Sequence, residues 1–329
     1  MDNKIELGSE IDVFGENLYL GRLRQHFKVC NVFTSQSSSN LHKATNHRPL
    51  VVVSSGRIST ALAAASVFSD SVIHVTTLMQ DWPQQLGDLQ FNENAKEIYS
   101  SHSREIGEIS KIFSDEKSEE IFDKIINFRK TYDLEYIRNF EDNQRHQYFE
   151  PFLPDSLDGS FIDVGAFDGW TSKCFRSIYG ESNRIIMLEP DPLNREIYFD
   201  QISAIPNSEL LAKGAGERFK KERFSSAGSA SGISRAGQHE VEIVPLDSVT
   251  NKKVGMIKMD IEGAEMSALR GAENILYKFL PILAIACYHS PLQLLEIPSY
   301  ISRLNGDYKV FLRHYTESIY ETVAYGVPR

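Results

Sequence analysis

The sequence has few cysteines, and their spacing excludes several kinds of site. Its 329 residues include three, Cys30, Cys174 and Cys287. They are far apart, and none belongs to a Cys-x-x-Cys pair. An odd, dispersed set argues against a disulfide framework and fits a reducing compartment, and the missing pairs argue against a structural zinc site.

Long apolar runs and an excess of basic residues are also missing. The longest apolar stretches, near 61–68 and 280–287, are far shorter than a membrane span needs, so we expect none. The polar first residues, MDNKIELGSE, differ from a signal or transit peptide, and we expect a cytoplasmic protein. With 35 Lys and Arg against 45 Asp and Glu, the net charge of −10 argues against nucleic acid as a partner.

The length suits two domains, and we expect the first over residues 1–140. It combines a buried-type strand at 49–53, an alanine-rich helix at 58–68, a strand at 72–78 and a charged helical stretch. One glycine, Gly56, marks the turn after the first of these strands. Because a lone glycine turn is weak evidence for a nucleotide pocket, a small accessory α/β docking module is favoured over that alternative.

Residues 141–329 alternate regularly between strand and helix patterns. Strands are expected at 161–164, 184–188, 209–212, 241–244, 254–259 and 282–287, helices at 171–179, 193–202, 265–279 and 292–304, and a hairpin at 308–315 and 319–325. This alternation predicts an α/β fold with a mostly parallel sheet, helices on both faces and a terminal antiparallel hairpin. A Ser/Gly-rich stretch at 224–234 suits either a binding loop or a hairpin tip.

The stretch 161–171, FIDVGAFDGWT, is typical of a strand, a glycine turn and a helix start that meet at a ligand. Dinucleotide sites use G-x-G-x-x-G, whereas this loop has G-x-x-x-G, Gly165 to Gly169, preceded by Asp163. The missing second glycine argues against a pyrophosphate, and no P-loop motif occurs. An acid beside the loop suits a cationic ligand with an amine and a ribose, such as S-adenosylmethionine.

Titratable residues also follow the other expected strands. Glu189 ends the second strand, where an acid suits the two hydroxyls of a ribose. Asp260 and Glu262 follow the strand at 254–259, and His289 follows the strand at 282–287. Lys258 suits a structural ion pair. A helix start explains the acid Glu265 better than it explains Glu262.

Four motifs occur in an order that resembles one family. They are DVGAFDG at 163–169, EPDP at 189–192, IKMDIEGAE at 257–265 and LRGA at 269–272. Together they resemble the FkbM family of S-adenosylmethionine-dependent methyltransferases over about residues 140–327. The resemblance implies a Rossmann-like class I methyltransferase fold and methyl transfer, usually to oxygen on a sugar, polysaccharide or natural product.

The resemblance also implies a set of cofactor-binding residues. Those expected along the methionine part are Asp163, Gly165, Ala166, Asp168, Gly169 and Thr171. Glu189 would hold the ribose, and Asp191 would lie near it or face solvent between two prolines. By fold analogy, Ala212 would lie near the adenine.

Asp260 and His289 are the expected catalytic residues. Histidine suits proton transfer near neutral pH, although a capping or core histidine is the alternative for His289. Asp260 could orient His289, bind a divalent metal or take the proton itself; no other metal ligand is expected. Tyr148, in the segment before the first strand, either enters the site from the side or pins that segment to the domain.

Two other classes of function stay open from the sequence. One is a nicotinamide-dependent oxidoreductase on the same fold, against which the loop argues. The other is a non-catalytic S-adenosylmethionine-binding partner, docked to a biosynthetic complex through residues 1–140. The acceptor, a small molecule or a glycan, its methylated position, the metal requirement and a homo-oligomeric state are not fixed by the sequence.

Overall fold

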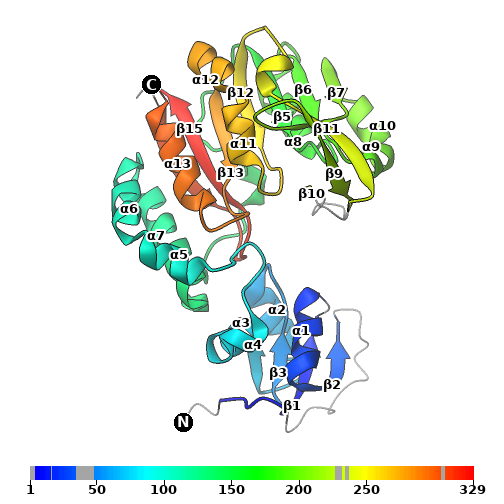
Figure 1. The fold of residues 1–329 in the computed structure, drawn as a ribbon, viewed down its shortest axis with the longest axis vertical. Helices are drawn as coiled ribbons and strands as arrows, with labels where there is room; N and C mark the ends of the chain where they lie inside the picture. The colour runs from blue at the N-terminus through cyan, green and yellow to red at the C-terminus, as the bar shows by residue number, and fades with distance from the viewer. Residues whose placement is uncertain (1–3, 16, 35–47, 227–231, 234–236, 305–307) are drawn as a thin grey trace. The chain divides into compact units, whose positions relative to one another are not determined.

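The computed structural model describes residues 4–15, 17–34, 48–226, 232–233, 237–304 and 308–329. The chain forms two compact units (Figure 1). Unit 1 comprises Met1–His102, Phe122–Asn143 and Tyr315–Glu321, and unit 2 comprises Ser103–Ile121, Gln144–His314 and Thr322–Arg329. The units are therefore interleaved along the chain, whereas the sequence predicts a single boundary near residue 140.

Unit 1 contains a parallel sheet of order β2-β1-β3-β4. The strands are β1 (Glu10–Phe14), β2 (Lys28–Phe33), β3 (Leu50–Val52) and β4 (Val72–His74), with α1 (Leu18–His26) and α2 (Ile58–Ala65) as crossovers. Apolar residues of three strands and α2 form its core: Phe14, Phe33, Leu50, Val52 and Ala65. Because β1 lies between β2 and β3, the strand order reverses beside β1, as in doubly wound folds.

The strand expected at 72–78 ends at His74, where α3 (Val75–Asp81) begins. The His74 side chain accepts a hydrogen bond from the backbone N–H of Thr76, which satisfies a free donor of the first helical turn. Further helices are α4 (Pro83–Leu86), α5 (Ala95–Ser101), α6 (Ser103–Ile109), α7 (Glu116–Thr131) and the 3₁₀ turns η2 (Ser110–Ile112), η3 (Leu134–Tyr136) and η4 (Gln144–His146).

Unit 2 is organised on a seven-stranded sheet of order β14-β15-β13-β12-β5-β6-β7. Its strands are β5 (Ser160–Val164), β6 (Ile185–Leu188), β7 (Ser208–Leu211), β12 (Val254–Met259), β13 (Ile282–Ala286), β14 (Tyr308–His314) and β15 (Thr322–Pro328). Strands β5, β6, β7, β12 and β13 run parallel to one another, and β15 runs antiparallel to β13 and β14. The predicted mostly parallel α/β sheet with a terminal antiparallel hairpin is thus confirmed.

The central strands β5, β6, β12 and β13 are buried along their whole length, as expected for a parallel sheet covered on both faces. The helices are α8 (Trp170–Tyr179), α9 (Pro192–Ile197), α10 (Phe199–Ser203), α11 (Glu265–Arg270), α12 (Glu273–Phe279) and α13 (Gln293–Arg303). The single helix expected at 265–279 is interrupted at Gly271, where a Cβ atom would lie 2.0 Å from the carbonyl oxygen of Gly216. The order reverses at β5, between β6 and β12, which places a ligand site at their carboxyl ends.

A second, four-stranded sheet of order β10-β9-β11-β8 belongs to the same unit (Figure 1). It contains β8 (Lys213–Ala215), β9 (Lys220–Ser225), β10 (Gly232–Ile233) and β11 (His239–Val244), followed by η6 (Leu246–Ser248). Most of the Ser/Gly-rich stretch at 224–234 lies outside the described residues. Among the described residues, no helix has both the length and the apolar character that crossing a membrane requires.

Candidate active site

The glycine loop after β5 is held against the end of β12. Gly165 has φ +78°, in the left-handed region that favours glycine, and a Cβ atom there would lie 2.0 Å from the carbonyl oxygen of Asp260. Gly169, with φ +76°, precedes α8, and Asp168 accepts a hydrogen bond of 2.9 Å from the N–H of Trp170. Glycine at 165 is therefore required for the close approach of the two strand ends.

Asp163 is fully buried below this loop. Its Oδ2 accepts a 2.7 Å hydrogen bond from the hydroxyl of Ser172, and its Oδ1 lies 3.2 Å from Nζ of Lys258. Lys258 also donates to the carbonyl of Gly165 at 2.6 Å. The ion pair expected for Lys258 is therefore present, and it compensates the buried charge of Asp163.

Glu189, directly after β6, connects the glycine loop after β5 with the loop after β6. Its Oε2 accepts a 2.9 Å hydrogen bond from the N–H of Phe167, and its Oε1 accepts one of 2.9 Å from the N–H of Asp191. Burial raises the pKa of Glu189, while these two backbone donors oppose the increase. The structure thus brings Glu189 and the glycine loop together, as expected for residues that follow neighbouring parallel strands.

The remaining expected cofactor residues occupy different settings. Asp191 caps α9 through a 2.9 Å bond from the N–H of Leu193, and its Oδ1 also accepts a 2.6 Å bond from the hydroxyl of Ser226. Thr171 is buried in the first turn of α8, whereas Ala212 is exposed between β7 and β8. Asp191 therefore binds Ser226, the residue directly after β9, a role that its place between two prolines did not indicate.

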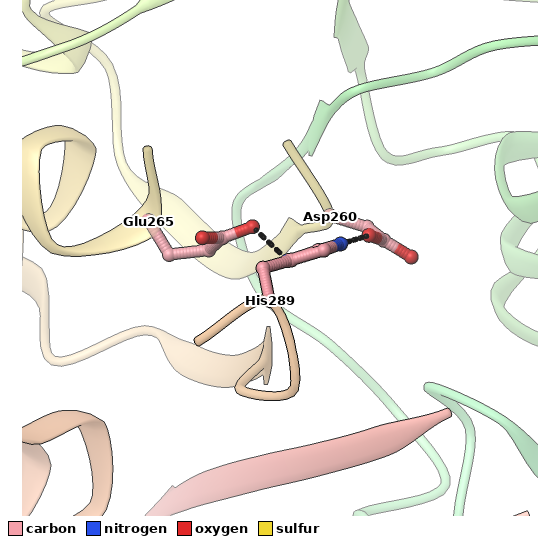
Figure 2. A group of neighbouring side chains, drawn as sticks. All are labelled: Asp260, Glu265 and His289. Carbon is pink, nitrogen blue, oxygen red and sulfur yellow. Dashed lines mark ion pairs between the residues drawn. The ribbon is translucent and has the colours of Figure 1, made fainter. Parts of the chain in front are cut away.

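His289 lies between two carboxylates at the ends of β12 and β13 (Figure 2). Its Nδ1 is 2.9 Å from Oε1 of Glu265, the first residue of α11, and its Nε2 is 3.4 Å from Oδ1 of Asp260. Glu262 lies on the same side, with Oε2 3.8 Å from Nε2. Each ring nitrogen therefore faces a carboxylate.

Glu265 is held rigidly in this arrangement. Its Oε1 accepts a bond from the N–H of Ile261 at 2.9 Å, and its Oε2 accepts one from the side chain of Gln293 at 2.5 Å. Burial by itself raises the pKa of Glu265, but the charge and hydrogen bond of His289 and the backbone N–H of Ile261 bring the pKa below its usual value. Glu265 therefore fixes the orientation of the imidazole.

The protonation of His289 follows from its neighbours. Burial lowers its pKa, but the carboxylate of Glu265 and then those of Asp260 and Glu262 raise it to about 9. At neutral pH the ring therefore carries both protons. To act as the expected base, His289 would first have to lose one of these two protons.

Two tyrosines hold Asp260. The hydroxyl of Tyr148 donates to Oδ2 at 2.6 Å, and that of Tyr288 lies 3.2 Å from Oδ1. The N–H of Tyr148 donates to the hydroxyl of Tyr325 at 2.9 Å, so Tyr148 both reaches the site and fixes its own segment. Tyr288 was not singled out from the sequence, although it directly precedes His289 at a strand end.

Donor atoms of Asp260, Glu265 and His289 also lie within 4.8 Å of one another, a spacing at which side chains can share a metal ion. In this cluster, however, the imidazole lies between the two carboxylates (Figure 2). A proton on each ring nitrogen satisfies both contacts, whereas a cation would need donor atoms that converge on one point. We therefore assign no chemical step to a metal.

The seven-stranded sheet with its terminal antiparallel hairpin has the class I methyltransferase fold. Residues 163–310 match the family model described as the Methyltransferase FkbM domain, so the resemblance drawn from the motifs is confirmed over this stretch. The fold is also similar to the crystal structure of methyltransferase FkbM from Methylobacillus flagellatus KT. That match has a TM-score of 0.74 and 20% identity, and covers 97% of this chain and 90% of the other.

Other solved structures match part of the chain. An rRNA methylase from Streptococcus thermophilus has a TM-score of 0.36 and 14% identity, over 53% of this chain and 89% of its own. A precorrin-6y C5,15-methyltransferase from Geobacter metallireducens GS-15 has a TM-score of 0.34 and 13% identity, over 54% and 83%. No curated protein matches the chain significantly.

Proposed function

We propose that this methyltransferase uses S-adenosylmethionine and methylates a hydroxyl group of a sugar, a polysaccharide or a natural product. The observation that supports this most directly is the meeting of three strand ends. Gly165 after β5 contacts the end of β12, and Glu189 after β6 bonds to the same loop. The edge at which the strand order reverses is where open α/β sheets bind their ligands.

In this proposal the cofactor lies along the glycine loop. The methionine part would be lined by Asp163, Gly165, Ala166, Asp168, Gly169 and Thr171. Glu189 would accept a hydrogen bond from the ribose through Oε2, which binds one backbone N–H and has a second lone pair; Oε1 already accepts from the N–H of Asp191 and, at 3.5 Å, from the side chain of Asn194. Asp191 would lie near the ribose and Ala212 near the adenine.

When bound, the sulfonium of the cofactor supplies an electrophilic methyl group. Asp260 and His289 would lie beside the acceptor, where the protein mainly fixes the line of attack. The carboxylates at this edge accept hydrogen bonds, as the hydroxyl groups of a sugar require. This set of acceptors supports a polyhydroxylated substrate.

Calorimetry with S-adenosylmethionine and S-adenosylhomocysteine tests the cofactor. We expect both to bind, and Glu189→Gln to weaken binding about tenfold, roughly the value of one charge-assisted hydrogen bond. Glu196→Gln, at an exposed position in α9, is the matched control and should bind as the wild type does. Folded wild-type protein that binds neither compound, or that binds NADH instead, would contradict the proposal.

A further inference from the structure

The carboxylates at the edge of β12 differ in how their oxygens are used. Asp260 accepts from two tyrosine hydroxyls and faces His289, and Glu265 is buried among its donors. The side chains of Asp260 and Glu262 are similarly exposed, at 23% and 21%, but the contact of Glu262 with His289 is long, at 3.8 Å. Of the three, Glu262 is the one whose oxygens accept no hydrogen bond from the described residues, so both can bind a ligand.

The backbone places Glu262 in an unusual conformation. Its φ is +54°, a left-handed value that costs a residue other than glycine about 1–3 kcal/mol. Gly263 follows with φ +103°, and α11 begins at Glu265. The turn between β12 and α11 therefore keeps a strained conformation at the residue that carries the accessible carboxylate, as turns at functional sites often do.

The small sheet borders the same residue. A Cβ atom on Gly232 of β10 would lie 3.6 Å from Cβ of Glu262. Ser226, directly after β9, donates to Asp191 beyond β6. Two described residues near the small sheet, Ser226 and Gly232, thus contact residues that follow β6 and β12, the strands on either side of the glycine loop.

We propose that Glu262 is a catalytic residue that takes the proton of the acceptor hydroxyl; this rests on the methyl transfer proposed above. The acceptor oxygen forms a bond to the methyl carbon while the carbon–sulfur bond breaks, and that electron pair goes to sulfur. The hydroxyl proton passes to the carboxylate of Glu262. The positive sulfonium and the negative carboxylate become a neutral thioether and a neutral acid, so atoms and charges balance.

The electrostatic surroundings support this role. Burial raises the pKa of Glu262, the charge of His289 lowers it, and Asp260 and Glu265 raise it, to about 7. These groups come from the residue after β12, from α11 and from the loop after β13, and Gly232 of β10 adds no charge. A general base works best when its pKa lies near the working pH, and His289 does not compete because it already holds its proton.

The first test needs no acceptor. Protein labelled with ¹³C at the glutamate carboxyl is titrated by NMR, with and without S-adenosylhomocysteine. We expect one carboxyl resonance with a midpoint near pH 7 that is lost in Glu262→Gln and kept in Glu273→Gln, an exposed glutamate at the start of α12. If no such resonance exists, or if it persists in Glu262→Gln, the proposal is wrong.

The second test measures transfer of labelled methyl groups from S-adenosylmethionine to methyl α-glucopyranoside and glycerol, as generic hydroxyl probes. Glu262→Gln should lose at least about 10²-fold in rate, the usual contribution of a general base, while its cofactor affinity stays within threefold of wild type. An undiminished rate would overturn the role of Glu262. If the wild type transfers to neither probe, the carboxyl titration decides alone. If the wild type binds no cofactor, the proposed function fails instead, which calorimetry shows separately.

Discussion

Two buried histidines, one in each unit, lie at or just after the ends of parallel strands and have opposite protonation states. His74 ends β4 in unit 1, and His289 follows β13 in unit 2; they are 2% and 5% exposed. Burial lowers the pKa of His74 to about 4, with only a partly opposing bond to the carbonyl of Ser54, whereas the pKa of His289 is about 9. Burial acts in the same direction on both.

The partners therefore decide the difference. His74 lies 2.7 Å from the carbonyl of Ser54 and 3.0 Å from the hydroxyl of Thr76, and neither carries a charge. His289 has a carboxylate at each nitrogen. The comparison shows that a histidine at a strand end is a structural cap in unit 1 and a charged centre in unit 2, and that only the neighbouring carboxylates separate the two.

Removing the charge of Glu265 should give the largest effect. In Glu265→Gln, His289 loses its closest carboxylate, so its pKa should fall well below 9, and unit 2 should lose about 3–5 kcal/mol of stability, as when one partner of a buried pair is removed. Urea unfolding followed by Trp170 and NMR titration of the imidazole measure both quantities. The matching change in unit 1, Thr76→Val, should leave His74 with a low pKa. If the imidazole of His289 still titrates near pH 9 in Glu265→Gln, Glu265 is not the residue that raises its pKa.

The pH dependence of stability should have opposite signs in the two units. The folded pKa of His289 is raised, so its contribution, about 3 kcal/mol, is present below pH 6.5 and lost as the pH rises through 9. The folded pKa of His74 is lowered, so its contribution is present above pH 6.5 and lost as the pH falls toward 4.

Single-tryptophan proteins measure these two windows separately, because Trp82 belongs to unit 1 and Trp170 to unit 2. His74→Gln should remove the acid-side loss from the Trp82 signal, and His289→Gln the loss between pH 7 and 9 from the Trp170 signal. Glu262 acts in the same direction as His289, but mainly between pH 4.5 and 7. The same slope in both signals would contradict the assignment.

The smallest expected effect on stability comes from changing Tyr148, which holds a carboxylate partner of His289. His74 has no carboxylate partner, so unit 1 has no residue with this role. Tyr148→Phe removes a 2.6 Å bond to Asp260 and keeps the ring, so unit 2 should lose about 1.5–3 kcal/mol, the usual value for a hydrogen bond to a charged group. Tyr277→Phe, exposed on α12, is the control. If thermal unfolding of unit 2 is equal in both variants, the Tyr148 bond does not hold Asp260.

The sequence was sufficient for the features that rest on local patterns. Continuous apolar runs located β5, β12 and β13, and the glycine spacing located the loop at Gly165. Because the carboxyl ends of parallel strands share one edge of a sheet, the proximity of Asp260 and His289 could also be predicted, and the structure places them 3.4 Å apart.

Features that depend on tertiary contacts could not be predicted from the sequence. Glu265 looked like a helix-start acid, because the macrodipole explains such residues without any partner, yet it is the residue that fixes His289. The roles of Tyr148 and Tyr288 depend on where their segments pass. β9, with the charged sequence KKERFS, shows no period-two alternation of apolar residues, so its pairing with β11 gave no signal.

The connection between β14 and β15 prevents the two units from being separated by a single cut in the chain. Residues Tyr315–Glu321 belong to unit 1, although both flanking strands lie in the sheet of unit 2. In unit 1, Glu317 binds the N–H and the hydroxyl of Ser59 at 2.7 and 2.6 Å. No single cut therefore releases either unit intact. A recombination event that exchanged only the leading segment would leave part of the old unit behind, so we expect the two to be inherited together.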